Sequence, residues 1–209
     1  MRKKKFYFIV FEGIEGTGKS YQINKLYKNL KEINFKVIKT REPGGSKTAE
    51  AIRNLIFSKR INNFDKLTDF YLINAARNEH VKKTLLVAKK QKKIVISDRF
   101  TDSTYAYQVK GNKINKSINT INQKYILQSL KPDLTIVLKS NIKNIFLRIK
   151  KRKNNNKFDR LKTNFYKNAQ NIFLSLAKKN KRYLVFDSSK NTPDLEKKIL
   201  SVVLKKINK

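Results

Sequence analysis

The feature that most constrains this chain is a glycine-rich loop near its start, which reads Gly13-Ile14-Glu15-Gly16-Thr17-Gly18-Lys19-Ser20. The loop follows an aromatic and β-branched run at 5–11 that is typical of a buried strand, and a helical pattern begins directly after it at Tyr21. Glycine permits positive φ angles and close backbone approach, so that successive N–H groups can point inward at a polyphosphate. This strand, loop and helix arrangement predicts a phosphate-binding loop for a nucleotide.

The polar side chains of this loop predict separate tasks. The Lys19 ammonium is expected to reach the β- and γ-phosphates and to act in catalysis, and the Ser20 hydroxyl is expected to bind Mg²⁺. The helix that begins here turns the positive end of its dipole toward the anion. We therefore expect the whole loop, from Gly13 to Ser20, to bind ATP.

The order of elements along the chain predicts an α/β fold. Short apolar strands are expected at 5–11, 35–40, 93–97, 134–138 and 183–186, with helical patterns between them. This alternation is typical of a parallel five-stranded sheet with helices on both faces, as in phosphate-loop enzymes. At 209 residues, the chain is long enough to bury a core and short enough that a single domain, 1–209, is expected.

Three loops follow the first three strands, at 12–20, 41–45 and 98–105. Ligands of parallel sheets bind beyond the carboxyl ends of the strands, so these loops are expected to meet at one site. Asp98 ends an apolar strand, a position from which phosphate-loop enzymes hold the Mg²⁺ shell, and Arg99 beside it is placed to pair with a substrate phosphate. The sequence therefore predicts a metal site at Ser20 and Asp98.

Further motifs run through most of the chain. Besides the phosphate-binding loop, they are Arg41-Glu42-Pro43-Gly44-Gly45, Ala75-Ala76-Arg77-Asn78-Glu79-His80, Ser97-Asp98-Arg99-Phe100, Asp102-Ser103-Thr104-Tyr105-Ala106-Tyr107-Gln108, Lys131-Pro132-Asp133-Leu134-Thr135 and Asp159-Arg160. In these motifs and their order, the chain resembles bacterial thymidylate kinases. The resemblance implies transfer of the γ-phosphoryl group of ATP to dTMP, giving dTDP and ADP for dTTP synthesis. It also implies direct in-line transfer with Mg²⁺ and a homodimeric enzyme.

The resemblance assigns dTMP contacts residue by residue. Glu15 is expected at the sugar 3′-hydroxyl, and the forked guanidinium groups of Arg53, Arg77 and Arg99 are expected around the phosphate. The alternative for Arg53 and Arg77 is an ordinary position on a helix surface. The remaining residues expected near the same nucleotide are Pro43, Ser103, Thr104, Tyr107 and Gln108.

The basic segment 148–160 matches the mobile lid of the family. Family members that lack an arginine inside the phosphate-binding loop place basic residues in the lid, and this chain has Gly16 where that arginine would stand. Closing the lid would exclude water and bring positive charge to the transferring phosphoryl group. Arg152 and Arg160 are expected to supply this catalytic charge.

Three positions depart from the family pattern. Ile73 stands where the family usually places an aromatic residue that stacks on thymine, so base binding is expected to use apolar contact there or another ring. The family usually has acidic residues directly after the lid, but the stretch 161–164 has none. Gln170 stands where family members commonly have an arginine.

The formal net charge of +35 first suggests a nucleic-acid partner. Lysine is spread over nearly every polar helical surface, however, as in Lys82-Lys83, Lys150-Lys151 and Lys205-Lys206. This spread favours solvated surface lysine, and we expect no specific nucleic-acid site. Two alternatives stay open: a kinase for another pyrimidine nucleoside monophosphate, and a nucleic-acid-binding phosphate-loop protein that exploits the charge.

The cysteine content and the length of the apolar runs indicate the cellular compartment. The chain has no cysteine, which agrees with a reducing cytoplasm, and no apolar run approaches the ~18 residues that a membrane span needs. A cytoplasmic enzyme without a membrane segment is therefore expected. The single histidine, His80, is expected at the surface or in packing, because phosphoryl transfer of this kind needs no imidazole base.

Overall fold

The computed structural model describes residues 5–58, 64–151, 162–190 and 192–208. Of the lid segment 148–160, it describes only the first four residues, 148–151. The predicted lid cations Arg152 and Arg160 lie outside the described residues.

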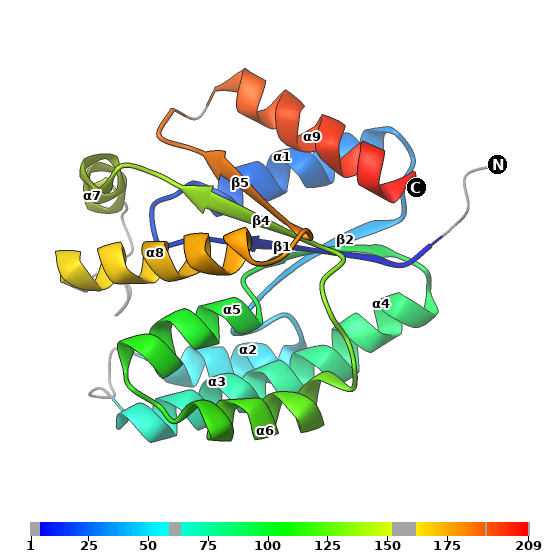
Figure 1. The fold of residues 1–209 in the computed structure, drawn as a ribbon. Helices are drawn as coiled ribbons and strands as arrows, with labels where there is room; N and C mark the ends of the chain where they lie inside the picture. The colour runs from blue at the N-terminus through cyan, green and yellow to red at the C-terminus, as the bar shows by residue number, and fades with distance from the viewer. Residues whose placement is uncertain (1–4, 59–63, 152–161, 191, 209) are drawn as a thin grey trace.

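Strands and helices alternate along the described chain (Figure 1). The strands are β1 (Tyr7–Glu12), β2 (Val37–Arg41), β3 (Ile94–Asp98), β4 (Leu134–Lys139) and β5 (Tyr183–Asp187). The helices are α1 (Lys19–Glu32), α2 (Lys47–Ile56), α3 (Lys66–His80), α4 (Leu86–Lys90), α5 (Thr101–Thr104), α6 (Lys116–Leu127), α7 (Ile142–Lys150), α8 (Thr163–Lys178) and α9 (Pro193–Ile207). Two π-helical segments, η1 (Val81–Leu85) and η2 (Tyr105–Gly111), continue α3 and α5. Each predicted strand is found within a residue or two of its expected bounds.

The five strands form one parallel sheet in the order β2-β3-β1-β4-β5, which confirms the predicted fold class. In the pairing of β1 with β3, Phe11 lies opposite Asp98. In the pairing of β2 with β3, Arg41 also lies opposite Asp98. The register therefore brings the ends of these three strands, and the loops that follow them, to the same edge of the sheet.

Both faces of the sheet are covered, as expected for parallel strands. Alternate residues of β1 point to opposite faces, because the side-chain period of a strand is two. Ile9 and Phe11 pack with α1 and α9 on one face, whereas Phe8 and Val10 pack with η1 and α4 on the other. Figure 1 shows α1 and α9 above the sheet and α2, α3 and α6 below it.

Local signals in the sequence account for several helix boundaries. The Ser46 and Asp65 side chains accept hydrogen bonds from backbone N–H groups in the first turns of α2 and α3, as N-cap residues do. Gly18 precedes α1 in the left-handed conformation, with φ of 86°. α3, η1 and α4 follow one another without a break, and the wider π-helical turn η1 begins immediately after His80.

Within the described ranges, no helix combines the length and the apolar character needed to cross a membrane.

Candidate active site

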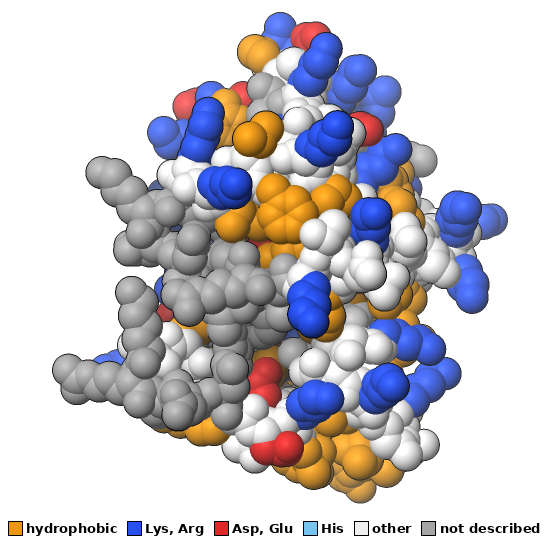
Figure 2. All heavy atoms as spheres, turned by 90° about the vertical axis from the view of Figure 1, so that its left-hand side faces the viewer, with side chains coloured by type: hydrophobic (Ala, Val, Ile, Leu, Met, Phe, Trp, Pro, Cys, Tyr) orange, Lys and Arg blue, Asp and Glu red, His pale blue; other side chains and the backbone are white. Residues whose placement is uncertain are grey.

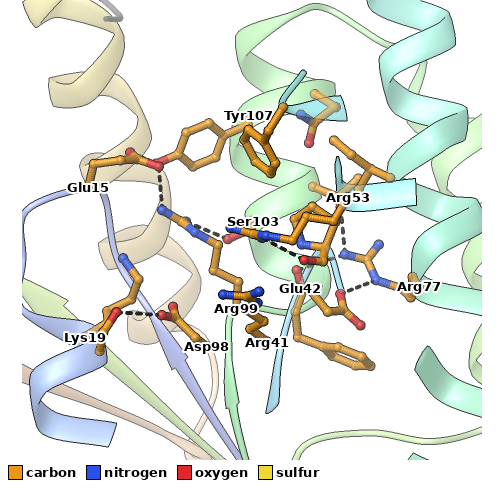
Figure 3. Close-up of a pocket in the computed structure, with 17 residues that line it drawn as sticks. Glu15, Lys19, Arg41, Glu42, Arg53, Arg77, Asp98, Arg99, Ser103 and Tyr107 are labelled. Atoms are coloured by element: carbon orange, nitrogen blue, oxygen red, sulfur yellow. Dashed lines mark hydrogen bonds and ion pairs between the residues drawn. The ribbon is translucent and has the colours of Figure 1, made fainter. Parts of the chain in front are cut away.

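A pocket opens at the carboxyl edge of the sheet, where the three predicted loops meet (Figure 3). The residues that line it are Glu15, Lys19, Ser20, Arg41, Glu42, Pro43, Arg53, Phe57, Ile73, Arg77, Asp98, Arg99, Phe100, Ser103, Thr104, Tyr107 and Gln108. All the residues that the sequence assigned to dTMP are among them, together with Lys19 and the predicted metal ligands Ser20 and Asp98. Residues spread over most of the first half of the chain thus converge on one cavity.

The phosphate-binding loop has the backbone that its glycines predict. Gly13 has φ of 140°, and a Cβ atom there would lie 2.4 Å from the Leu138 carbonyl oxygen, so only glycine fits. The Lys19 ammonium folds over the loop and donates to the carbonyl oxygens of Gly13 and Ile14, each at 2.9 Å. Burial, reinforced by the Arg99 charge, lowers the pKa of Lys19 to about 8, although nearby carboxylates oppose the change.

The two predicted metal ligands are in contact. The Ser20 hydroxyl donates to Asp98 Oδ2 at 3.1 Å. The other carboxylate oxygen, Asp98 Oδ1, is buried and has no hydrogen-bond partner among the described residues. Hydroxyl and carboxylate oxygens are the ligands that Mg²⁺ prefers, so this pair fits the metal that the sequence predicts.

Arg99 is the centre of a buried polar cluster (Figure 3). Its Nη2 lies 2.6 Å from Glu15 Oε1, and its Nη1 donates to the Ser103 hydroxyl at 2.9 Å. The Tyr107 hydroxyl donates to the other Glu15 oxygen at 2.6 Å, and burial raises the pKa of this phenol well above its usual value. The cluster joins the phosphate-binding loop to the loop after β3 and orients the Arg99 guanidinium in the pocket.

Glu12 holds the loop after β3 next to this cluster, a role that was not predicted from the sequence. Its carboxylate accepts hydrogen bonds from the backbone N–H of Phe100 at 2.8 Å and from the Ser103 hydroxyl at 2.7 Å. Burial, and then the nearby Asp102 carboxylate, raise its pKa to about 8 against the opposing effect of Arg99. The available signal was an acidic residue at the end of an otherwise apolar strand, which is costly to bury unless it is bonded.

Arg77 reaches the pocket from α3. Its side chain is buried, so the helix-surface alternative is wrong for this residue. Nε donates to Glu42 Oε2 at 2.7 Å, and Nη2 donates to the Phe100 carbonyl at 3.1 Å and to the Thr104 hydroxyl at 2.9 Å. Nη1 is also buried but has no hydrogen-bond partner in the part of the chain that the structure describes. A buried donor without a partner is unfavourable unless a ligand accepts from it.

Arg53 lines the pocket from α2 and contacts the 41–45 loop. Its Nη1 donates to the Pro43 carbonyl at 2.7 Å, and its guanidinium carbon lies 4.6 Å from the centroid of the Phe57 ring. Phe57 and Ile73 also line the pocket. Ile73 therefore lies where the sequence allowed an apolar contact with the base, whereas Phe57, at a helix end without any motif, was not predicted.

Of the two positions that the sequence left open for His80, at the surface or in packing, the structure shows packing. The side chain is fully buried, which excludes the surface position. Its Nδ1 lies 2.9 Å from Glu42 Oε1 and its Nε2 lies 2.7 Å from the Thr40 hydroxyl. The only histidine therefore contacts a residue that lines the pocket without lining it itself.

The pocket carries an excess of positive charge. Five of its lining side chains are cationic, Lys19, Arg41, Arg53, Arg77 and Arg99, against the three acidic side chains Glu15, Glu42 and Asp98. Lys and Arg side chains are also spread over the upper and right-hand parts of the face drawn in Figure 2, which is the left-hand side of Figure 1. This excess of positive charge suits two phosphorylated ligands, whose negative charges would otherwise repel one another.

Arg148 is the one arginine of the lid segment that lies within the described residues. Its Nη1 donates to the Gly16 carbonyl at 3.2 Å, and its Nη2 donates to the carbonyls of Ser188 and Ser189, each at 2.9 Å. The start of the segment is thereby tied to the phosphate-binding loop. The catalytic roles expected for Arg152 and Arg160 fall on residues that the structure does not describe.

Comparison with known proteins gives a consistent result. A family model described as thymidylate kinase matches residues 11–199. The thymidylate kinase of Mycoplasma capricolum is 34% identical over 203 residues, covering 96% of this chain and 95% of the relative. The thymidylate kinase of Pelobacter propionicus is 34% identical over 206 residues, covering 95% and 94%. The crystal structure of thymidylate kinase from Ehrlichia chaffeensis superposes with a TM-score of 0.76 at 32% identity, covering 95% of this chain and 99% of that one.

Proposed function

Because the chain belongs to the thymidylate kinase family, and so transfers the γ-phosphoryl group of ATP to dTMP, we propose how its pocket residues carry out this reaction. The observation that carries the proposal is the convergence of two anion-binding groups in one cavity. The phosphate-binding loop with Lys19 forms one group, and the arginines at 53, 77 and 99 form the other. Catalysis then follows from positioning and charge neutralisation.

The phosphate-binding loop is proposed to hold ATP. The N–H groups of 13–20 surround the triphosphate, and the Lys19 ammonium moves from the carbonyls of Gly13 and Ile14 to the β- and γ-phosphates. Ser20 and Asp98 are proposed to hold Mg²⁺, an assignment supported by Asp98 Oδ1, which has no hydrogen-bond partner among the described residues. When bound, Mg²⁺ neutralises charge on the phosphate oxygens.

The Arg99 cluster is proposed to hold dTMP. Arg53, Arg77 and Arg99 surround its phosphate, where a forked guanidinium can bind two oxygens at once. Glu15 accepts from the sugar 3′-hydroxyl, which suits a carboxylate already fixed by Arg99 and Tyr107. The remaining residues proposed to contact the nucleotide are Pro43, Ser103, Thr104, Tyr107 and Gln108.

No side chain of the pocket is proposed to become covalently phosphorylated. With the two nucleotides bound end to end, the dTMP phosphate oxygen attacks the γ-phosphorus in line and ADP leaves. Lys19 and Arg99 both line this cavity, and their positive charges are proposed to stabilise the charge of the transition state. Arg152 and Arg160 stay predicted contributors of further positive charge from the lid.

We further propose that the enzyme is a homodimer. α3 packs between α2 and α6, and this layer carries exposed apolar side chains that would be covered in a dimer. They include Tyr125, 76% exposed, and Ile121, 56% exposed, both on α6. The others are Leu55, Leu67 and Tyr71. Figure 2 shows hydrophobic side chains gathered at the lower end of its view, where this layer lies.

We also propose that residues 1–209 act as one kinase domain in the cytoplasm. The sheet that positions the site draws strands from Tyr7 to Asp187, which supports a single unit. ATP and dTMP are intracellular metabolites, and a cysteine-free chain needs no oxidising compartment. The charge of +35 is proposed to reflect solvated lysine, without a specific nucleic-acid site.

A substrate screen tests the proposed function. ADP release is measured with dTMP, dUMP, CMP and UMP as acceptors, at equal ATP and Mg²⁺. We expect dTMP to give the highest kcat/KM. Preference for another pyrimidine nucleotide would indicate the related kinase, for which Ile73 in the pocket is the residue to examine. Salt-dependent DNA binding without any kinase activity would contradict the enzyme assignment.

A further inference from the structure

His80 lies at the end of α3, behind the loop 41–45 that forms one wall of the pocket. Its side chain has no exposed surface, and each ring nitrogen has one partner. Nε2 lies 2.7 Å from the Thr40 hydroxyl, and Nδ1 lies 2.9 Å from Glu42 Oε1. The imidazole therefore connects the end of β2 to the carboxylate that follows it.

The charge on Glu42 fixes the direction of the Nδ1 contact. Burial raises the pKa of this carboxyl, but the Arg77 guanidinium and His80 outweigh burial and hold the pKa below its usual value. Glu42 is therefore ionised and can only accept hydrogen bonds. Nδ1 must carry a proton and donate it to Glu42.

Glu42 shares its two oxygens between His80 and Arg77. Oε1 accepts from His80, while Oε2 accepts from Arg77 Nε at 2.7 Å. With Nη2 held by Phe100 and Thr104, the guanidinium plane of Arg77 is fixed at two edges. The third edge, Nη1, is the buried donor without a partner among the described residues. Figure 3 shows Arg77 and Glu42 facing one another at the pocket.

The space around His80 holds the imidazole in place. A Cβ atom on Gly45 would lie 2.4 Å from His80 Cδ2, so the ring packs directly against the glycine backbone of the loop. The π-helical segment η1 begins at the next residue, Val81, and such wide turns are frequent at functional sites. The ring has little freedom to move away from Glu42.

We propose that His80 is a positioning residue for dTMP binding: acting through Glu42, it holds the Arg77 guanidinium so that Nη1 faces the nucleotide. Without the bond to His80, Glu42 Oε1 is a buried acceptor with an unpaired charge, and the carboxylate turns toward other donors. Arg77 Nε then loses its fixed acceptor, and the guanidinium loses its orientation. This inference rests on the proposed role of Arg77 in binding dTMP.

Two substitutions of His80 distinguish the contribution of the Nδ1 contact from that of the Nε2 contact. In His80→Asn, the amide nitrogen takes the place of Nδ1 and keeps a donor for Glu42. In His80→Gln, the amide nitrogen reaches the place of Nε2, and the Glu42 contact is lost. We expect His80→Gln to raise the KM for dTMP about tenfold, as for loss of one charge-assisted hydrogen bond. His80→Asn should stay within about threefold of the wild type, and neither variant should change kcat or the KM for ATP more than about twofold.

Introducing His80→Gln into an Arg77→Met variant tests whether His80 acts on the KM for dTMP through Arg77. Coupled residues are non-additive, so His80→Gln should not raise the KM for dTMP further in that background. Equal effects of the Asn and Gln variants, or an undiminished rise in the Arg77→Met background, would overturn the proposal. If Arg77→Met alone leaves the KM for dTMP unchanged, the proposed role of Arg77 fails, and the role of His80 fails with it.

Thermal melting of each variant separates positioning from loss of fold. If His80→Gln does not fold, Glu42→Gln takes its place, because it keeps the shape of the side chain and removes the charge that organises Arg77. We then expect about a tenfold rise in the KM for dTMP in the wild-type background and none in the Arg77→Met background. A rise of equal size in both backgrounds would refute the positioning role.

Discussion

Replacing Lys19 by methionine should abolish turnover and make the protein more stable. The Lys19 ammonium is buried, and burial together with Arg99 lowers its pKa from 10.5 to about 8. A pKa difference of about 2.5 corresponds to about 3 kcal/mol by which the folded state disfavours the charged lysine at neutral pH. Methionine has a similar length and carries no charge, so this penalty disappears.

Part of that gain is offset by lost hydrogen bonds. The ammonium donates to the carbonyls of Gly13 and Ile14, and each such bond contributes about 1 kcal/mol. The Ile14 carbonyl also accepts from the Thr17 hydroxyl at 2.8 Å, so only the Gly13 carbonyl loses its side-chain donor altogether. We expect Lys19→Met to gain about 1 to 2 kcal/mol at pH 7, or roughly 4 °C in Tm for a chain of this length.

The stability difference between Lys19→Met and the wild type depends on pH. Below pH 8 lysine is protonated in both states, and the penalty is fully present. Between pH 8 and 10.5 the unfolded chain keeps a proton that the folded protein has released, so wild-type stability rises with pH relative to the variant. The difference in free energy of unfolding between Lys19→Met and the wild type should therefore be largest near pH 7 and shrink, then reverse, toward pH 10.5.

Denaturant unfolding from pH 7 to 10.5 and a coupled ADP-release assay measure both effects. The kcat of Lys19→Met should fall at least ~100-fold, because the cation proposed to reach the transferring phosphoryl group is lost. Lys89→Met, an exposed lysine on α4, is the control and should change stability by less than about 0.5 kcal/mol at every pH. A Lys19→Met variant that is less stable than the wild type at pH 7, or that retains turnover, would refute the reasoning.

Three further predictions concern the dTMP cluster and the dimer. Arg99→Ala removes the guanidinium that bonds Glu15 and Ser103 together; steady-state kinetics should show at least a tenfold rise in the KM for dTMP and a fall in kcat, and unchanged kinetics would refute its placement. Glu15→Gln should raise the KM for dTMP about tenfold but that for 3′-deoxy-dTMP much less, and equal effects on both nucleotides would argue against the 3′-hydroxyl contact. Tyr125→Glu places a charge on the exposed apolar layer, so we expect sedimentation to show a dimer for the wild type and a monomer for the variant; an unchanged mass would exclude this face as the interface.

Much of the fold follows from local sequence signals. The five strands are short apolar runs, and the helices between them have caps or periodic apolar residues, so their order and type could be predicted. The π-helical segments η1 and η2 could not, because a single wide turn leaves the apolar pattern of a helix almost unchanged. This matters at the site, since η2 carries Tyr107 and Gln108 and η1 begins directly after His80.

The site also contains residues that could be predicted from the sequence and residues that could not. Lys19, Ser20, Asp98 and Arg99 belong to motifs or strand ends, and the sequence brought them together correctly in one pocket. The tasks of Glu12 and His80 could not be predicted, because they depend on contacts across the sheet edge with residues up to 91 positions away. No periodicity or spacing reports which buried polar group faces which donor.

A bisubstrate analogue shows whether ATP and dTMP bind end to end in one cavity. Adenosine and thymidine joined through a 5′,5′-pentaphosphate should bind one molecule per chain, compete with both ATP and dTMP, and bind more tightly than either nucleotide alone, because the second binding event becomes intramolecular. Substituting Lys19 or Arg99 should weaken it in each case. An analogue that competes with only one of the two substrates, or that binds no more tightly than that substrate alone, would contradict the account.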